Sequence, residues 1–374
     1  MKILIAPDKF RGTLTANEAA KAMAEGVRRY NPDWEVRLLP IADGGEGTAE
    51  VLTLASGGTM VSARASDPYL RYVACEYGVS GDGTTAFIDM AAASGLHRLQ
   101  ASEVNAMKTS SLGTGQLIFH ALNRKCSRIV LGLGGTATMD CGTGIAHALG
   151  ISFLDELQRV VAPIGGNLGK IEFIDISKRF PALNKANFIV LADVALPLLG
   201  EEGAMLFADQ KGITEADRAR ISGNLAHFAN LMEASHGTVA RTPGMGAAGG
   251  AALGCMGLLG AKLAFGADFV MEALQVPQAI SEADLVITGE GMLDDQSLHG
   301  KAAIALSRAA QRQSKPVLAI CGKISLAPEQ QQEAGITMSG ALVGELDGQL
   351  PEDSARELAI RTEEMLRELA PKLA

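Results

Sequence analysis

Four apolar segments of this chain each run directly into an acidic residue. The acids are Asp8, Asp43, Asp193 and Glu290, and turn-forming residues follow each of them. Open parallel sheets bind ligands beyond the carboxyl ends of their strands, where several gathered acids would repel one another unless a cation lay among them. Carboxylate oxygens suit Mg²⁺, so the pattern predicts a site for magnesium with a nucleotide phosphate. For any one acid, capping of the next helix or turn is the alternative interpretation.

Clusters of glycine lie beside the same acids. The chain has 43 glycines in 374 residues, which is about 11% against a usual share of about 7%. Backbone N–H groups at the start of a helix can bind phosphate, whereas tight turns and close packing are the alternative use of glycine. The clusters comprise Gly44, Gly45, Glu46, Gly47 and Thr48; Gly134 and Gly135; Gly244 to Gly250; and Gly289 and Gly291.

A dense polar block follows the last of these clusters. It contains Asp294, Gln296, Ser297 and Lys301. A lysine just past a glycine-rich turn can act as a point charge on a phosphate, whereas the ordinary alternative is a lysine exposed on the surface. The block therefore makes Lys301 a candidate for binding phosphate.

Short β-branched runs alternate with helical patterns along the chain, which is typical of an α/β fold with a largely parallel sheet. One helix is expected to open at Thr15, where Glu18 completes a capping box, and to end before Pro32. A final helix is expected over 352–369. Strands are expected over 2–6, 36–41, 85–90, 128–133, 188–192, 284–288, 316–321 and 340–343.

The middle of the chain differs from its two ends. From about residue 70 to about residue 270, loops are longer, strands and helices alternate less regularly, and most of the double-glycine clusters occur. We therefore expect one domain formed by residues 1–70 and 271–374, with a second domain over residues 71–270 inserted into it.

Composition excludes several classes of protein. The net charge is −9, aromatic residues make up 4%, and no basic run is long enough to follow a nucleic acid. The five cysteines are scattered without a CxxC pair, which favours a reducing compartment over disulfides or a zinc site. The uncharged stretch from Met245 to Ala261 falls short of a membrane span of about 20 residues. Because no signal peptide is recognised either, we expect a soluble, cytoplasmic protein.

One glycine motif has a competing interpretation. Gly132, Gly134 and Ala137 follow a strand with the G-x-G-x-x-A spacing of dinucleotide-binding folds, and Asp155 stands about where a ribose-binding acid would. Few apolar residues between them could form the packed crossover helix, so an NAD-dependent oxidoreductase is the weaker alternative. The sequence contains no P-loop, protein-kinase motif, histidine pair at metal spacing or nucleophile elbow.

Motifs spread over most of the chain occur together in one order. They occupy 5–14, 42–48, 90–96, 113–115, 134–140, 193–198, 210–212, 246–250 and 289–302. From residue 1 to about residue 325, this series resembles the type I glycerate kinases. The resemblance implies ATP-dependent phosphorylation of D-glycerate with Mg²⁺, in most bacterial members at the 2-hydroxyl. It also implies a Rossmann-like parallel-sheet domain formed by both chain ends, with a second α/β domain inserted.

The resemblance also gives the candidate residues their roles. We predict Asp193 as the base for the substrate hydroxyl, with Asp43 as the second choice, and Lys301 as the charge on the transferring group. Magnesium would be held by Asp43, Asp193 and Glu290. The nucleotide would contact Gly44, Gly45, Glu46, Gly47, Thr48, Gly134, Gly135, Gly289 and Gly291. The substrate would contact Asp8, Lys9, Arg11, Thr136, Asp140, Asp294, Gln296 and Ser297, with Arg11 on its carboxylate.

The expected partners are the hydroxy acid and ATP, without nucleic acid or membrane, and a homodimer is the assembly to test. Six positions depart from the family pattern, namely Lys9, Arg11, Met139, Cys141, Leu196 and Met292. At Met139, Leu196 and Met292 the family usually has polar residues, which could hold a carboxylate or a phosphate. Three hypotheses therefore stay open: a D-glycerate kinase, a kinase for a related hydroxy acid, or a ligand-binding paralogue without activity.

Overall fold

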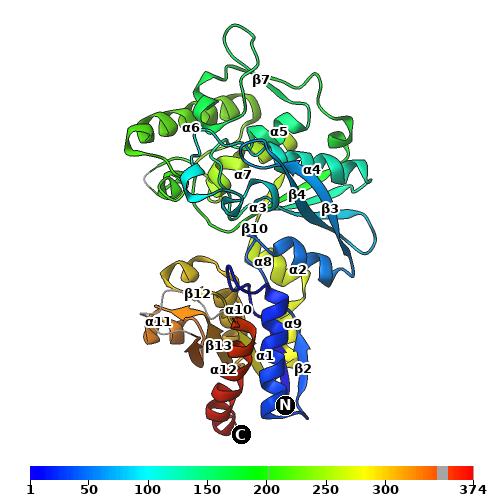
Figure 1. Ribbon diagram of the computed structural model, residues 1–374, viewed down its shortest axis with the longest axis vertical. Coiled ribbons are helices and arrows are strands. Elements are labelled where there is room, and N and C mark those ends of the chain that lie inside the picture. The colour runs from blue at the N-terminus through cyan, green and yellow to red at the C-terminus, as the bar shows by residue number, and fades with distance from the viewer. Residues whose placement is uncertain (201, 343–352, 374) are drawn as a thin grey trace. The chain divides into compact units, whose positions relative to one another are not determined.

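The chain folds into two compact units in the computed structural model, which describes residues 1–200, 202–342 and 353–373 (Figure 1). The terminal unit combines Met1–Asp43 with Ala267–Ala374, and the middle unit is Gly44–Gly266. The first boundary therefore lies at residue 43 rather than near residue 70, and the second lies at 266 rather than 270. The reason at the first boundary is that the strand starting at Thr59 pairs along its length with the strand starting at Tyr72.

The terminal unit is built on a five-stranded parallel sheet with the order β15-β13-β11-β1-β2. Runs of Ile, Val and Leu form its inner strands, because aliphatic side chains pack well on a sheet covered on both faces. Residue 343, the last of the strand expected over 340–343, lies outside the described residues. The strands are β1 (Lys2–Ile5), β2 (Glu35–Leu38), β11 (Leu285–Thr288), β13 (Val317–Cys321) and β15 (Met338–Ala341), with the short pair β12 (Met292–Leu293) and β14 (Lys323–Ile324).

This order contains a reversal. One strand–helix–strand series runs from β1 to β2, and the other runs from β11 through β13 to β15 on the opposite side of β1. The arrangement is Rossmann-like, and the point where the order reverses lies between β1 and β11. The expected α/β class with a parallel sheet is confirmed.

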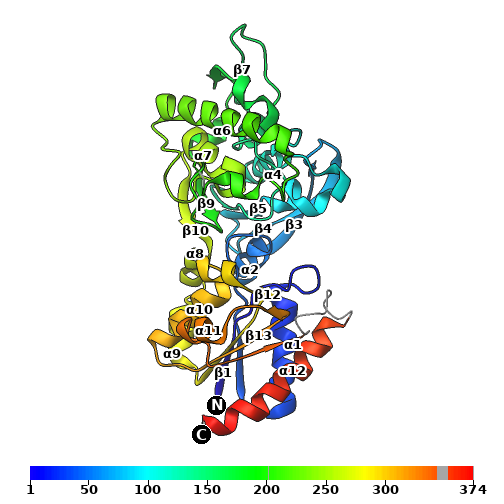
Figure 2. The ribbon, with the colours of Figure 1, turned by 90° about the vertical axis from the view of Figure 1, so that its left-hand side faces the viewer.

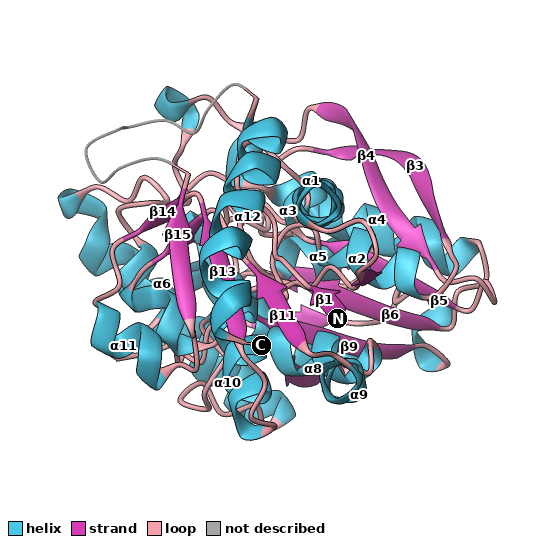
Figure 3. Cartoon of the chain, turned by 90° about the horizontal axis from the view of Figure 1, so that it is seen from below, coloured by secondary structure: helices cyan, strands magenta, loops and turns pink. Residues whose placement is uncertain are grey.

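Helices cover both faces of the terminal sheet (Figure 3). On one face, α1 (Ala16–Tyr30) and α12 (Ser354–Leu369) lie side by side, and on the other face lies α10 (Ala302–Arg312). The predicted capping box opens α1, since Thr15 and Glu18 accept from each other's backbone N–H groups. Residue 352, the expected start of the last helix, lies outside the described residues. The other helices are α8 (Gly266–Ala273), α9 (Val276–Glu282) and α11 (Pro328–Glu333).

The middle unit contains a six-stranded sheet with the order β10-β9-β6-β5-β4-β3. Its first four strands run parallel, and β4 and β3 continue it as antiparallel strands. A separate hairpin pairs β7 (Ser152–Leu154) with β8 (Phe173–Asp175). The sheet strands are β3 (Thr59–Ser66), β4 (Tyr72–Val79), β5 (Thr85–Asp89), β6 (Arg128–Gly132), β9 (Asn187–Ala192) and β10 (Lys262–Phe265).

Helices of the middle unit enclose its main core. The uncharged stretch noted above forms α7, which packs against α6 (Figure 2). Its first turn is irregular, because Ala248, Gly249 and Gly250 have φ angles of 54°, 63° and 86°. None of the helices in the described residues has the length and apolar character that crossing a membrane requires. The helices are α2 (Thr48–Ala55), α3 (Ala91–Ser94), α4 (Leu112–Asn123), α5 (Thr143–Ala148), α6 (Glu215–His236) and α7 (Ala247–Leu259).

Candidate active site

Two acids of the terminal unit follow the strands on either side of the topological reversal. Asp8 comes three residues after β1, and Glu290 comes two residues after β11. The ladder continues past the strands, since the N–H of Asp8 donates to the carbonyl oxygen of Gly289 at 2.8 Å. Asp43 follows β2, the other neighbour of β1. We call Asp8, Asp43 and Glu290 the acidic edge, which lies where open parallel sheets bind ligands.

Burial shifts the titration of the acidic edge. Asp8 is 5% exposed and Glu290 is 4% exposed. Burial, followed by repulsion from Asp43, raises the pKa of Asp8 to about 7, while the charge of Lys9 opposes the shift. Burial also raises the pKa of Glu290 to about 7 against the opposing charge of Lys301. Both acids therefore exchange protons near neutral pH, and a cation binding there would displace those protons.

Lys301 brings a positive charge to the acidic edge. Its Nζ lies 3.2 Å from Oε2 of Glu290 and 3.5 Å from Oδ1 of Asp294, and it donates to the carbonyl oxygen of Met292 at 3.3 Å. Burial alone would lower the pKa of Lys301, but the two carboxylates outweigh burial and raise it, so the ammonium stays charged. A charged lysine in this position can bind a phosphate oxygen.

One oxygen of Glu290 lacks a donor. Its Oε1 is buried and has no hydrogen-bond partner among the residues that the structure describes. Leaving such an atom unpaired costs about 1–3 kcal/mol or more, and Mg²⁺ would satisfy it because that ion prefers carboxylate oxygens. Within the described ranges, no group of three or more His, Cys, Asp or Glu side chains surrounds a metal position. Magnesium bound here would complete its shell with water and phosphate oxygens, as it commonly does.

The polar block after Glu290 folds into a capped turn. Oδ1 of Asp294 accepts from the N–H of Ser297 at 3.0 Å and from its hydroxyl at 3.2 Å, and Ser297 is fully buried. These two residues, predicted as substrate contacts, thus bond each other and hold the turn that leads to Lys301. Gln296 on the same turn is exposed.

Two glycines at this edge allow close packing. A Cβ on Gly289 would overlap the carbonyl oxygen of Ile320, and one on Gly291 would lie 3.0 Å from the backbone nitrogen of Arg11. Because backbone lies against both positions, close packing explains these glycines, which we had predicted as phosphate contacts. Arg11 itself is exposed.

In the middle unit, a carboxylate already occupies the glycine-rich start of α2. Asp89, at the end of β5, accepts from the N–H of Gly47 at 2.7 Å and from the N–H of Ala49 at 2.9 Å. The N–H of Gly44 donates to the hydroxyl of Thr48 at 3.1 Å. A nucleotide phosphate would have to compete for these donors. Sequence reasoning missed Asp89, although it ends an apolar strand as the four predicted acids do.

Asp193 lies at the end of β9, beside the strand β6. Gly134 follows β6, and a Cβ on it would lie 2.5 Å from Oδ2 of Asp193. The missing side chain therefore brings bare backbone up to the carboxylate. The next residue, Gly135, has a φ of 77° and turns the chain. We call residues 134–138 the glycine loop; the half-buried Asp193 is its neighbouring acid.

A buried lysine supports the glycine loop. Lys211 is 6% exposed, and its Nζ donates to Oγ1 of Thr136 at 3.0 Å and to the carbonyl oxygen of Thr138 at 2.9 Å. Burial lowers the pKa of Lys211 to about 8, while the charges of Asp193 and Asp140 oppose the change. We had not predicted Lys211 as a site residue. The motif at 210–212 includes Lys211, but its partners lie 73 and 75 residues away in the chain, so the local sequence does not show what it contacts.

Asp140 holds the far end of the same segment. Its carboxylate accepts from the N–H and the hydroxyl of Ser111 at 2.8 and 2.7 Å, and from the N–H groups of Gly142 and Gly144. Burial raises the pKa of Asp140, and these hydrogen bonds oppose the shift. Asp140 is fully buried. We had predicted a substrate contact, but a buried acid with four donors fixes the backbone around it.

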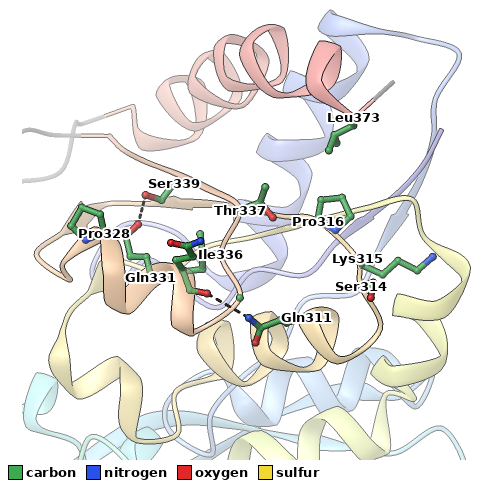
Figure 4. A pocket seen from close by; sticks show the side chains of 12 residues that line it. Gln311, Ser314, Lys315, Pro316, Pro328, Gln331, Ile336, Thr337, Ser339 and Leu373 are labelled. Carbon is green, nitrogen blue, oxygen red and sulfur yellow. Dashed lines mark hydrogen bonds between the residues drawn. The ribbon is translucent and has the colours of Figure 1, made fainter.

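A pocket of about 710 Å³ lies elsewhere on the terminal unit (Figure 4). Pro316 and Thr337, which precede β13 and β15, line the pocket. The pocket therefore lies where these strands begin, whereas the acidic edge lies where the strands end. Lys315 in its wall donates to the carbonyl oxygen of Ala283. Its lining residues include no Asp or Glu, so this pocket offers neither a base nor carboxylate ligands for a cation.

Comparison with known proteins identifies the family of this chain. A family model described as the glycerate kinase family matches residues 3–370. The chain belongs to this family. A glycerate 2-kinase of Escherichia coli is 42% identical over 87% of this chain and 86% of its own length. A glycerate kinase of Halalkalibacterium halodurans is 41% identical over 91% of this chain and 90% of its own length.

A solved structure supports membership of the glycerate kinase family. The crystal structure of a Salmonella typhimurium protein assigned as glycerate kinase 2 matches with a TM-score of 0.85 at 36% identity. The match covers 100% of this chain and 99% of that chain. The match therefore includes both the terminal unit and the middle unit of this chain.

The NAD interpretation does not fit this family or the local structure. A dinucleotide fold needs a helix to start at the G-x-G turn, but α5 begins only at Thr143, six residues after Ala137. Asp155 accepts from the N–H groups of Leu157 and Arg159 in a turn after β7. That turn leaves Asp155 without a crossover helix to bring it to a ribose.

The departures from the glycerate kinase pattern lie in different environments. Met139 is fully buried in the core of the middle unit, and Cys141, where the family has Gly, has a φ of 50°. Leu196 is half-buried. Met292 is 44% exposed and binds Lys301 through its carbonyl oxygen. A carbonyl oxygen is common to all residues, so the contact to Lys301 does not depend on the side chain at position 292.

Proposed function

We propose that this protein transfers the γ-phosphoryl group of ATP to the 2-hydroxyl of D-glycerate with the help of Mg²⁺. The observation that carries the proposal is the pairing of Glu290 with Lys301 at the acidic edge. In a chain of the glycerate kinase family, this pair offers an unpartnered carboxylate oxygen for a cation and an ammonium for phosphate. Phosphoryl transfer depends chiefly on such positioning and neutralisation of charge.

Magnesium fits the acidic edge. Glu290 offers its unpartnered oxygen as a direct ligand, and the negative charges of Asp8 and Asp43, which act on the same region, would attract the ion and could reach it through water. Bound together with ATP, the ion would neutralise negative charge on the phosphate oxygens. Asp193, which we had also predicted as a ligand, belongs to the middle unit, and we assign it the role of base.

Residues of this chain carry the remaining steps. Asp193 accepts the proton of the substrate hydroxyl as the hydroxyl oxygen bonds to the γ-phosphorus. The bond from the γ-phosphorus to its bridging oxygen breaks, and ADP leaves with the electron pair. Lys301 donates hydrogen bonds to the transferring group, and the backbone of Gly134 lies beside the base. Arg11, exposed on the loop after Asp8, is the candidate for the substrate carboxylate.

The direct test is release of ADP from ATP and Mg²⁺ in the presence of D-glycerate, with the product identified by NMR. We expect acid-dependent release of ADP and formation of 2-phosphoglycerate. Tartronate and erythronate, assayed in parallel, would reveal a preference for another hydroxy acid. Failure of all three acids to stimulate ADP release would contradict the proposal and favour a ligand-binding protein without turnover.

A further inference from the structure

The ammonium group under the glycine loop has unusual partners. Both acceptors of Lys211, the hydroxyl of Thr136 and the carbonyl oxygen of Thr138, are neutral. Burying a charge is expensive, so buried lysines normally pair with a carboxylate. The negative charges that act on Lys211 belong to Asp193 and Asp140, but its hydrogen bonds go to the loop. The ammonium of Lys211 therefore directs these hydrogen bonds to the glycine loop.

The hydrogen bond from Lys211 to Thr136 has a fixed direction. An ammonium has three N–H donors and no acceptor, so Oγ1 of Thr136 must accept. The hydroxyl of Thr136 then keeps its own proton to donate, and a hydroxyl that accepts from a cation is the stronger donor. The described residues provide no acceptor for that proton. Thr136 follows Gly134, whose bare backbone lies next to Asp193, with Gly135 between them.

Thr138 provides a contrast within the same loop. Its hydroxyl oxygen is also buried, and it has no hydrogen-bond partner in the part of the chain that the structure describes. Lys211 contacts Thr138 through the carbonyl oxygen only. The loop thus holds two buried threonine hydroxyls, of which one is polarised by the lysine and the other is not.

We propose that Lys211 and Thr136 form an anion-binding pair, in which Lys211 donates to Thr136 and Thr136 donates its own proton to an anionic oxygen of the ligand. The identity of this ligand rests on the proposed function, because a hydroxy acid and ATP both carry anionic oxygens. Thr136 touches the ligand, whereas Lys211 is a positioning residue that acts through Thr136. A carboxylate and a phosphate share this chemistry, and separate affinity measurements distinguish them.

The test is calorimetric titration of the full-length protein with D-glycerate and, separately, with ATP and Mg²⁺. Thr136→Val removes the polarised hydroxyl and keeps the shape of the side chain, and Thr136→Ser restores the hydroxyl. The matched control is Thr138→Val, which makes the same change at the unpolarised hydroxyl of the same loop. Lys211→Met and Lys211→Arg remove and restore the positive charge. These titrations measure binding without requiring turnover.

We expect Thr136→Val to raise the Kd of one ligand at least about 10-fold, which corresponds to about 1.4 kcal/mol. Thr136→Ser should bind within about threefold of the unaltered protein, and so should Thr138→Val. Lys211→Met should weaken the same ligand, with Lys211→Arg recovering part of the loss. A loss confined to D-glycerate assigns the pair to the carboxylate, and a loss confined to ATP assigns it to a phosphate.

Two results would overturn the anion-binding pair. The first is no loss of affinity in Thr136→Val, and the second is an equal loss in Thr136→Val and Thr138→Val, which would indicate a change in loop packing. Binding of both ligands by the unaltered protein without release of ADP would refute the proposed function and leave the pair standing. Binding of neither ligand would refute both.

Discussion

The acidic edge and the surroundings of the glycine loop differ in how fully their buried charged groups are hydrogen-bonded within the chain. At the acidic edge, burial raises the pKa values of Asp8 and Glu290 to about 7, and one oxygen of Glu290 has no partner among the described residues. Beside the glycine loop, Asp140 is just as buried but has four donors, and Lys211 binds two oxygens of the loop. The first region is electrostatically incomplete, and the second is largely satisfied by its own chain.

This difference indicates a division of tasks between the two units. Buried acids that repel one another respond to an added cation, because binding it removes repulsion that the fold itself leaves in place. Acids and lysines with partners cannot respond in that way, but they hold backbone and side chains in position. We therefore expect ligands to change the stability of the terminal unit, and substitutions near the glycine loop to change catalysis or backbone order.

The largest effect is expected at the base. Asp193→Asn should lower kcat at least about 100-fold, since general-base catalysis commonly contributes 10²–10⁴-fold. The thermal midpoint should change little, because Asp193 is half-buried and its change to Asn keeps the shape of the side chain. Steady-state kinetics and a thermal scan check both points, and a near-normal kcat would remove Asp193 from the mechanism.

A stability loss without a ligand effect is expected at Asp140. Asp140→Asn replaces an oxygen that accepts from Ser111 and Gly144 with an amide that donates, and should lower the free energy of unfolding by about 2–3 kcal/mol. Denaturant unfolding measures this loss. Asp155→Asn in the turn after β7 is the control, with a much smaller expected change, because its ion pair with Arg159 is screened by solvent. Similar losses in the two variants would contradict the structural role of Asp140.

The effect of a glycine-to-alanine substitution on the free energy of unfolding should depend on whether backbone lies against that glycine. Gly289→Ala should lower the free energy of unfolding by about 1–3 kcal/mol, because its Cβ would overlap the carbonyl oxygen of Ile320. Gly223→Ala in α6 is the control, since its Cβ meets nothing within 4 Å and alanine favours a helix by about 0.5–1 kcal/mol. If Gly289→Ala were neutral in the same unfolding experiment, close packing would not explain that glycine.

The smallest effect is a pH-dependent response to magnesium. The folded-state pKa values of Asp8 and Glu290 lie above their ordinary values of 3.8 and 4.5. The folded protein therefore binds more protons than the unfolded chain between about pH 4 and pH 7, and these groups make stability fall as pH rises through that window. Mg²⁺ should restore stability at pH 8, by about 1.4 kcal/mol at ten times its Kd, and have little effect at pH 5.

Thermal scans with and without Mg²⁺ at the two pH values measure this response. Glu290→Gln should abolish most of the magnesium effect at pH 8, because the amide cannot offer two anionic oxygens. Equal stabilisation by Mg²⁺ at pH 5 and pH 8 would show that the ion binds somewhere other than the acidic edge.

Local patterns in the sequence predicted much of the scaffold. The capping box of Thr15 and Glu18, the strands and the α/β class are confirmed, because capping and strand patterning depend on neighbours in the chain. The acids at strand ends were found in the same way, and the same pattern would have found Asp89. The compact units divide at residue 43 and not near the expected residue 70, and local patterns did not indicate this because the pairing of β3 with β4 is a tertiary property.

Other features could not be read from local patterns. The contact of Lys211 with Thr136 forms only in the folded protein, because the two residues are 75 positions apart in the chain. Gly134 and Gly289 stand in similar glycine-rich turns, yet one faces a carboxylate and the other a backbone carbonyl. The partners of a buried charge and the neighbours of a missing Cβ depend on the whole fold, which a single sequence does not display.

The discontinuous terminal unit has a consequence for synthesis on the ribosome. The strands β1 and β2 are synthesised first, but β1 pairs with β11 and α1 packs against α12, and both of these partners are synthesised much later. The packing of α1 against α12 is close, because a Cβ on Gly26 would overlap the carbonyl oxygen of Ala359. About 300 residues separate these partners, which at about 5–20 residues per second means roughly 15–60 s of translation. The middle unit emerges whole within that interval. We therefore expect it to fold first while the nascent N-terminal segment waits with an unpaired strand edge, the stage at which chaperones would be most useful.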